Sequence, residues 1–262
     1  MPHPFGSEYT SVAEVAAALE RVEADCLSRR DRRGVFATAY LQITRAIERE
    51  LALGSFQDAA WTAHYLVAFG NLYRNAALAF DSGDMSNVPK AWRLAFQAAR
   101  DGEGLVIQHL VLGINAHINH DLALALLVAG IDPGRSMRYA DHTRVNSILE
   151  RTTEDLKHQV SSLHAPLLQR IDWIAGRLDD DLTRFSIPKA REHAWTFAVM
   201  LSGVRDPGER ALMNRALDEQ AAVLARLVLS RPTRHPILLS AVRTAGRADA
   251  FARRIVGVVR RR

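Results

Sequence analysis

The sequence predicts an all-α protein, a single globular multi-helix bundle of about nine or ten helices around a buried central helix over residues 105–129. Almost every segment repeats its apolar residues at spacings of three and four, which is typical of helices. No two segments show the alternation and tight turn of a β-hairpin. The chain has 262 residues, of which 48% are hydrophobic and 24% charged, and this composition suits a globular protein with a sizeable core.

The first four helices are predicted from their ends as well as from their periodicity. Ser11 and Glu14 form a capping-box pattern at the start of the first helix. Gly54 is placed to end the second helix, and the third covers about residues 56–80. Pro89 opens a short fourth helix, because proline is tolerated in the first helical turn.

The later helices are bounded by glycine, proline and aspartate in the same way. They are expected over about residues 105–129 and 140–163, from near Pro166, between Pro188 and Gly203, from Asp206–Pro207, and in the arginine-rich segment after Pro236. The connections between these segments are short, and no Gly/Ser-rich or Pro-rich linker divides them. We therefore expect one all-helical domain over residues 1–230, followed by a basic, helical appendage over residues 231–262 that packs on it.

The positive charge of the chain is concentrated in that appendage. The net charge is +5 and the sequence pI is about 9.8. Residues 231–262 hold nine arginines and one aspartate, which gives +8, so residues 1–230 carry 5 − 8 = −3. We expect the appendage to dock through its apolar residues and to leave its arginines in solvent. Peripheral contact with an anionic membrane is the alternative, and nucleic-acid binding is not expected.

The sequence predicts a cytoplasmic location. The first residues lack the basic and apolar regions of a secretory signal. The most apolar stretch, residues 105–129, is interrupted by seven polar side chains, which argues against a membrane span. Cys26 is the single cysteine, so an internal disulfide is excluded.

Polar residues form two groups on the predicted central helix. On a helical wheel, one arc contains His109, Gly113, His117, His120 and Asp121, whereas Gln108, Asn115 and Asn119 lie on another side. Apolar residues fill the remainder, which is typical of a buried helix. Buried imidazole, amide and carboxylate groups need partners, so we expect neighbouring helices to supply them. The amides are expected to bond between helices, and Gly113 leaves room for a ligand or a neighbouring helix.

The spacing of His117 and Asp121 predicts a metal site. Residues four apart lie on one helical face, where an imidazole and a carboxylate can share one divalent cation such as zinc, iron or manganese. The doublet His120–Asp121 also resembles the metal-binding pair of helical phosphohydrolases of the HD type. His64 and Asp141 are candidate partners from other helices. The alternative is a structural hydrogen-bonded pair without metal, and the sequence leaves both interpretations open.

The motif Gly113–Leu122 resembles the signature of a largely actinobacterial family of unknown function, whose helix reads G-x-N-A-H-I-N-x-D-L. Further residues that fit this family are Asp58, Trp61, Trp92, Phe96, Asp141, Val145, Asn146, Arg191, Ala194 and Trp195. The resemblance implies that seven polar residues act together: Asn115, His117, Asn119, Asp121, Asp141, Asn146 and Arg191. We take Asn115, Asn119, Asp141 and Arg191 as candidate catalytic residues, and His117, Asp121, His120 and His64 as candidate metal ligands.

The same helix is locally similar to the zinc-binding helix of the phospholipase C and P1-nuclease superfamily. The chain lacks the H-x-x-x-E helix of those enzymes, so a mononuclear or dinuclear site is expected rather than a trinuclear one.

These patterns predict a divalent-metal-dependent hydrolase that acts on a phosphoester or related bond in a small molecule. The first alternative is a non-catalytic helical protein that binds a ligand or partner and uses the polar residues as a structural network. A non-haem iron oxidase is the second alternative. No glycine-rich phosphate loop occurs in the chain, so no nucleotide cofactor is expected.

Overall fold

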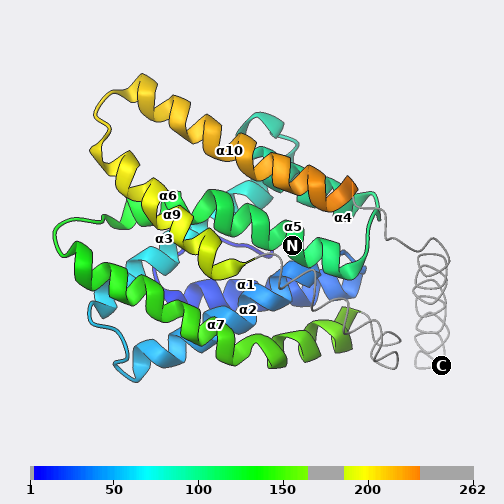
Figure 1. Ribbon diagram of the computed structural model, residues 1–262. Helices are drawn as coiled ribbons and strands as arrows, with labels where there is room; N and C mark the ends of the chain where they lie inside the picture. Colours follow the sequence, from blue (N-terminus) through cyan, green and yellow to red (C-terminus); the bar gives the residue numbers. More distant parts are fainter. Residues whose placement is uncertain (1–2, 165–185, 231–262) are drawn as a thin grey trace, which may run out of the picture.

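The computed structural model describes residues 3–164 and 186–230, and these residues form an all-helical bundle without strands (Figure 1). The α-helices are α1 (Val12–Arg29), α2 (Gly34–Ala52), α3 (Ala59–Ser82), α4 (Lys90–Arg100), α5 (Val106–Ala116), α6 (Leu122–Ala129), α7 (Arg135–His164), α9 (Ile187–Gly203) and α10 (Pro207–Ser230). A short 3-10 helix, η1 (Met85–Asn87), precedes α4, and a π-helical segment, η2 (His117–Asp121), joins α5 to α6.

The predicted all-α class is confirmed, but the predicted helix count is slightly high for the described residues. They form eight helices when α5, η2 and α6 are taken as one continuous central helix. The helices expected near Pro166 and after Pro236 lie outside the described residues, as does the whole appendage 231–262. The helix expected from about residue 140 begins earlier, at Arg135, directly after the turn that contains Pro133.

Local capping chemistry sets several of the helix ends. The Ser11 hydroxyl accepts a hydrogen bond from the Glu14 backbone N–H at 3.2 Å, as the capping-box pattern predicts. The Glu14 carboxylate accepts from the Thr10 N–H at 2.6 Å, one residue before the usual position. At the start of α10, Asp206 Oδ1 accepts from the Glu209 N–H at 2.8 Å.

The central helix lies in the middle of the bundle. Helices α2, α3, α4, α9 and α10 all pack against some part of it. Val106–Ala129 is long and apolar enough to cross a membrane by composition alone, yet 83% of its most apolar stretch is buried within the bundle. Its hydrophobicity is therefore explained by its place in the core.

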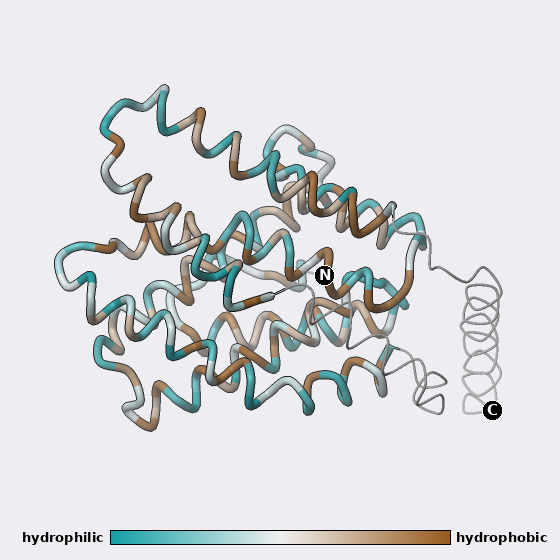
Figure 2. The backbone as a smooth tube through the Cα atoms, in the orientation of Figure 1, coloured by the Kyte–Doolittle hydropathy of each residue, from teal (hydrophilic) through white to brown (hydrophobic). Residues whose placement is uncertain are grey.

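The outer helices are amphipathic, since hydrophilic and hydrophobic residues alternate along α7 and α10 (Figure 2). Helix α10 packs on α4 and α5 at one side of the bundle, and α7 packs on α2 at the other (Figure 1). This arrangement leaves the polar residues of the central helix enclosed between helices from both halves of the chain.

Candidate functional site

The central helix widens into a π-helical turn where the family motif lies. The Leu122 N–H bonds to the His117 carbonyl, five residues back, and all five residues of η2 are buried. Single π turns inside α-helices occur frequently at functional sites. The turn brings His117, His120 and Asp121 into one hydrogen-bonded group.

Asp121 is the centre of that group. Its carboxylate, which is only 1% exposed, has three donors around it. Trp92 Nε1 of α4 donates to Oδ2 at 2.7 Å, and His117 Nδ1 lies 3.3 Å from the same oxygen. His120 Nδ1 lies 2.8 Å from Oδ1. Both carboxylate oxygens are therefore occupied by protein donors.

The protonation states follow from these bonds. An ionised carboxylate only accepts, so both imidazoles carry a proton on Nδ1. Burial alone would raise the pKa of Asp121, but the hydrogen bonds from His117 and His120 outweigh it and lower that pKa. Burial would lower the pKa of His120, but Asp121 outweighs it and raises that pKa. For His117, burial prevails over Asp121 and lowers the pKa. The shifts therefore favour the charged forms of His120 and Asp121 and the neutral form of His117.

The His117 ring is enclosed by aromatic side chains. The ring of Phe69 stacks on it with centroids 3.4 Å apart, and Tyr40 meets it edge-on at 4.3 Å. With Nδ1 facing Asp121, the second nitrogen, Nε2, is buried and has no hydrogen-bond partner among the described residues. A neutral imidazole with its proton on Nδ1 has a lone pair on Nε2, so this atom is a buried acceptor without a donor.

Gly113 lies one turn before His117 and admits an aromatic ring from α2. A Cβ at this position would lie 2.4 Å from Cγ of Phe36, and the Phe36 ring also contacts His117, with centroids 5.5 Å apart. The room that Gly113 leaves is therefore filled by a side chain of a neighbouring helix, α2.

His109 begins the same stripe and is also held neutral. Burial, followed by the charge of Arg32, lowers its pKa to about 4. Arg32 Nη1 lies 3.4 Å from His109 Nε2.

The amides on the other side of the central helix bind α10. Gln108 Nε2 donates to the Val228 carbonyl at 2.8 Å, and Asn115 Nδ2 donates to the Ala221 carbonyl at 2.8 Å. Asn119 Nδ2 then donates to Asn115 Oδ1 at 2.9 Å. The two donors, Gln108 and Asn115, are seven residues apart, and so are their two acceptors on α10. Seven residues span two helical turns, so two turns of the central helix are joined to two turns of the antiparallel α10. Asn115 and Asn119, taken as catalytic candidates, lie in this interhelical contact.

Asp141 lies at a different place, at the beginning of α3. Its carboxylate accepts from the Gln57 N–H at 2.8 Å and from the Asp58 N–H at 2.7 Å. Asp58 in turn caps α3 by accepting from the Trp61 N–H at 2.9 Å. Asp141 therefore joins α7 to the loop that precedes α3.

Arg191 joins α9 to α7. Its Nη2 donates to the His142 carbonyl at 2.6 Å and its Nε donates to Asn146 Oδ1 at 2.8 Å. Tyr65 Oη is 3.4 Å from Nη1, and none of the partners among the described residues is a carboxylate. Burial, followed by the charge of Arg191, lowers the pKa of His142 well below its usual value. Asn146, which the resemblance grouped with Arg191, is thus in direct contact with it.

The sequence-predicted residues therefore lie in separate clusters. No hydrogen bond or ion pair of the described residues connects His117 or Asp121 with Asp141 or Arg191. His64 is exposed on α3, whereas Tyr65 and Phe69 on the buried face of that helix point into the core. The structure therefore does not bring His64 to His117.

The arrangement of histidine, cysteine and carboxylate side chains bears on whether a metal fits here. Within residues 3–164 and 186–230, no group of three or more His, Cys, Asp or Glu side chains is arranged to hold a metal ion. His117 Nε2 is the one ring nitrogen of the π turn that is both buried and without a partner among the described residues. In the π turn, only His117 Nε2 is therefore placed to coordinate a metal ion.

Comparison with known protein families supplies an assignment. The model of a family of unknown function (DUF5995) matches residues 12–231. The chain belongs to this family. The predicted membership of a family of unknown function is confirmed, while the actinobacterial motif stays a prediction. Comparison with curated proteins and with solved structures found no match.

Sequence reasoning on this DUF5995 chain missed the role of Trp92. The periodicity of its helix indicates only a core residue, yet its indole N–H is a donor to Asp121. Likewise, no pattern in the sequence indicates that Phe69 and Tyr40 contact His117. The resemblance, which includes Trp92, was the only signal that could have pointed to it.

Proposed function

We propose that this DUF5995 protein is a non-catalytic helical ligand-binding protein whose buried His/Asn/Asp residues form a structural hydrogen-bond network. The main support for this proposal is that both carboxylate oxygens of Asp121 already have hydrogen-bond donors from the protein. Its two oxygens face three protein donors, at 2.7, 2.8 and 3.3 Å. Hydrogen bonds to a charged group stabilise a fold by about 1.5–3 kcal/mol each, so a metal would have to displace strong existing interactions.

The protonation of the second imidazole, His120, also favours a structural network without metal. Asp121 raises the pKa of His120, which favours the imidazolium with both nitrogens protonated, whereas a metal ligand needs an unprotonated nitrogen. The amides Asn115 and Asn119 are likewise engaged with α10 and with each other. A buried polar network whose members are paired in this way specifies how helices pack, and here it fixes α4 and α10 against the central helix.

One observation favours the divalent-metal-dependent hydrolase as a second candidate. His117 Nε2 is buried without a partner, and its ring is oriented by a carboxylate at Nδ1, as metal-ligating histidines commonly are. In that function His117 would hold a zinc, iron or manganese ion, Asp121 would orient the imidazole, and the metal would supply an activated water for phosphoester hydrolysis. A non-haem iron oxidase would use the same atoms, and no observation favours it specifically.

Metal content and chelator sensitivity separate the two candidates. We expect protein purified without added metal to contain less than one zinc, iron or manganese per chain. We also expect its thermal midpoint to be the same with and without EDTA. One bound metal per chain, together with a midpoint that falls in EDTA, would establish the metal site and refute the network proposal.

A pair of variants makes the test specific to the central helix. His117→Gln removes the Nε2 ligand, whereas His64→Gln changes an exposed histidine of α3. If the network proposal holds, neither substitution changes metal content. Loss of stoichiometric metal in His117→Gln but not in His64→Gln would support the hydrolase.

A further inference from the structure

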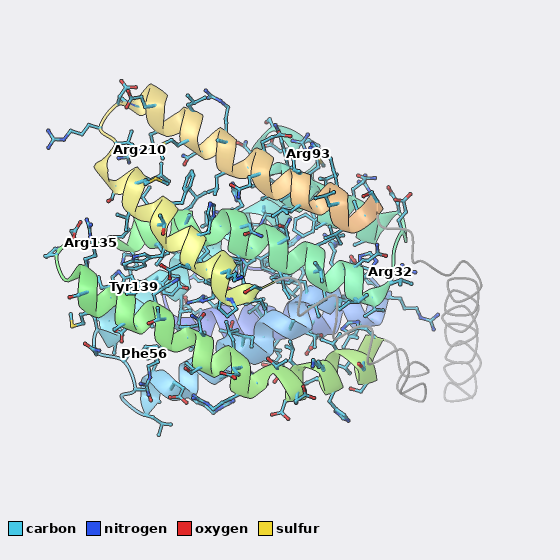
Figure 3. All side chains as sticks on the ribbon, viewed as in Figure 1. Arg32, Phe56, Arg93, Arg135, Tyr139 and Arg210 are labelled. Atoms are coloured by element: carbon cyan, nitrogen blue, oxygen red, sulfur yellow. The ribbon has the colours of Figure 1, made fainter. Side chains whose placement is uncertain are left out.

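An open hollow of about 580 Å³ lies between the N-terminal end of α7 and the middle of α9. It is lined by Gly134, Arg135, Ser136, Tyr139, Glu192 and Trp195. Sites for small molecules commonly measure about 300–1,000 Å³. Arg135 and Tyr139 lie at this end of the bundle, far from Arg32 in the same view (Figure 3). This hollow is lined by none of Asn115, His117, Asp121, Asp141 and Arg191.

Two aromatic rings form one wall. The ring centroids of Tyr139 and Trp195 are 5.2 Å apart and their planes are inclined by 52°. Tyr139 is 36% exposed, while Trp195 is only 6% exposed. The Trp195 indole N–H has no hydrogen-bond partner among the described residues, and it is not one of their buried unpaired polar atoms, so it is open to solvent. This wall offers an apolar face and an unused donor.

The other groups at the hollow supply acceptors and further donors. The Tyr139 hydroxyl donates to Glu192 Oε2 at 2.8 Å, which fixes the carboxylate and leaves Oε1 as an acceptor. The first amide of α7 with a helical bond is that of Arg138, which bonds to Gly134. The amides of residues 135–137 therefore belong to the unsatisfied first turn that every helix has. Donors and acceptors thus lie beside the aromatic wall.

Side chains of the core hold the Trp195 side of the aromatic wall in place. The His142 ring lies 5.3 Å from the Trp195 ring, and Arg191 fixes α9 to α7 through His142 and Asn146. Trp61 also contacts Trp195 edge-on, with centroids 6.4 Å apart. A wall fixed in this way reduces the ordering cost of binding. The Arg191 cluster would then act as a positioning element for the hollow.

The charges at the hollow disfavour an anion. Arg135 is engaged with Asp132, its Nη2 lying 2.6 Å from Oδ2, whereas Glu192 contributes a carboxylate to the hollow. The Glu192 carboxylate would repel an anionic ligand and oppose the attraction that the first-turn amides of α7 offer to negative charge. A neutral molecule with an apolar C–H face and hydroxyl groups that both donate and accept matches the aromatic wall, Glu192 and the free N–H groups together.

We propose that this hollow binds a neutral sugar, with its C–H face against the exposed ring of Tyr139 and its hydroxyls at Glu192 and the Trp195 N–H. This inference rests on the proposed ligand-binding function and names the ligand class. The full-length protein is titrated with glucose, galactose, mannose, N-acetylglucosamine and their common disaccharides, and binding is followed by saturation-transfer NMR. Inorganic phosphate and succinate serve as anionic probes.

Substitutions assign the binding to the hollow. Trp195→Phe keeps a ring but removes the N–H, and Glu192→Gln removes the carboxylate charge. Glu150→Gln is the matched control, since Glu150 is an exposed carboxylate of α7 that does not line the hollow. We expect at least one neutral sugar to bind, about tenfold more weakly in either hollow variant, and equally well in the control. Thermal midpoints close to that of the parent confirm that the variants are folded.

Three results would overturn the inference. They are the absence of binding for every sugar in the panel, binding that Trp195→Phe and Glu192→Gln leave unchanged, and preferential binding of phosphate or succinate. These failures are distinct from failure of the proposed function. A metal-free protein that binds no sugar would retain its structural network, whereas a stoichiometric metal at His117 would refute the network irrespective of sugar binding.

Discussion

Acidification should destabilise this protein well above the range in which carboxylates titrate. His109, His117 and His142 are buried, and burial lowers the pKa of each below the usual histidine value. A histidine that stays neutral in the fold but takes up a proton when unfolded makes the unfolded state more favourable as the pH falls. These three histidines therefore leave the free energy of unfolding undiminished above their unfolded pKa of about 6.5, and they lower it as the pH falls below that value.

The magnitude can be worked out for His109. Its pKa is about 4 in the fold against a usual value of 6.5. One proton bound only by the unfolded state changes the free energy of unfolding by about 1.4 kcal/mol per pH unit. Between pH 6.5 and about pH 5, His109 alone then removes about 1.6 kcal/mol, because the unfolded histidine is already half protonated at pH 6.5. His117 and His142 act in the same direction.

The charged pair behaves differently. The raised pKa of His120 contributes stability that is present below its unfolded pKa and is lost as the pH rises through its folded pKa. The lowered pKa of Asp121 contributes stability that is present above its unfolded pKa and is lost as the pH falls through its folded pKa. Between pH 6.5 and about pH 5, only His120 opposes the three neutral histidines, so the net stability falls.

Urea denaturation measured at intervals from pH 7 to about pH 5 tests this prediction. We expect His109→Gln to reduce the slope of unfolding free energy against pH by about 1 kcal/mol per unit between pH 6 and pH 5. The exposed His64→Gln is the control and should keep the parental slope. A His109→Gln variant with the parental pH dependence would refute the reasoning, because it would show that His109 titrates normally in the fold.

Two substitutions test the packing and bonding of the π turn. Gly113→Ala should destabilise the fold by about 1–3 kcal/mol, because its Cβ would lie 2.4 Å from Cγ of Phe36; an unchanged urea midpoint would show that Phe36 moves away freely. Trp92→Phe should cost about 1.5–3 kcal/mol by removing the N–H donor 2.7 Å from Asp121 Oδ2, and a thermal midpoint equal to that of the parent would exclude this bond as a stabilising contact.

The parts of the fold that depend on local chemistry could be predicted from the sequence. The Ser11 cap is formed by residues close together in the chain, and so is the end of α9 at Gly203. The wheel placed His109, Gly113 and His117 on one face, and two of these positions indeed meet the same ring, Phe36 of α2. Periodicity suffices here because each statement concerns one helix.

The partners of the polar stripe could not be predicted, because they come from other helices. Trp92 is 29 residues away from Asp121, and the Asn115 acceptor, Ala221, is 106 residues away. A helical period shows which face of a helix is buried but not which helix covers it. The π turn also changes the phase of the wheel within the motif itself. For the same reason, the resemblance that groups Asp141 and Arg191 with His117 does not show which helices each of them contacts.

The protonation of His117 tests the central claim most directly. A proton–nitrogen correlation spectrum of the histidine side chains, assigned with His117→Gln, reports which ring nitrogen carries a proton. The network account predicts a neutral His117 protonated on Nδ1 and a His120 protonated on both nitrogens, with both unchanged when zinc or EDTA is added. A shift of His117 Nε2 that appears with zinc and disappears with EDTA would contradict the account.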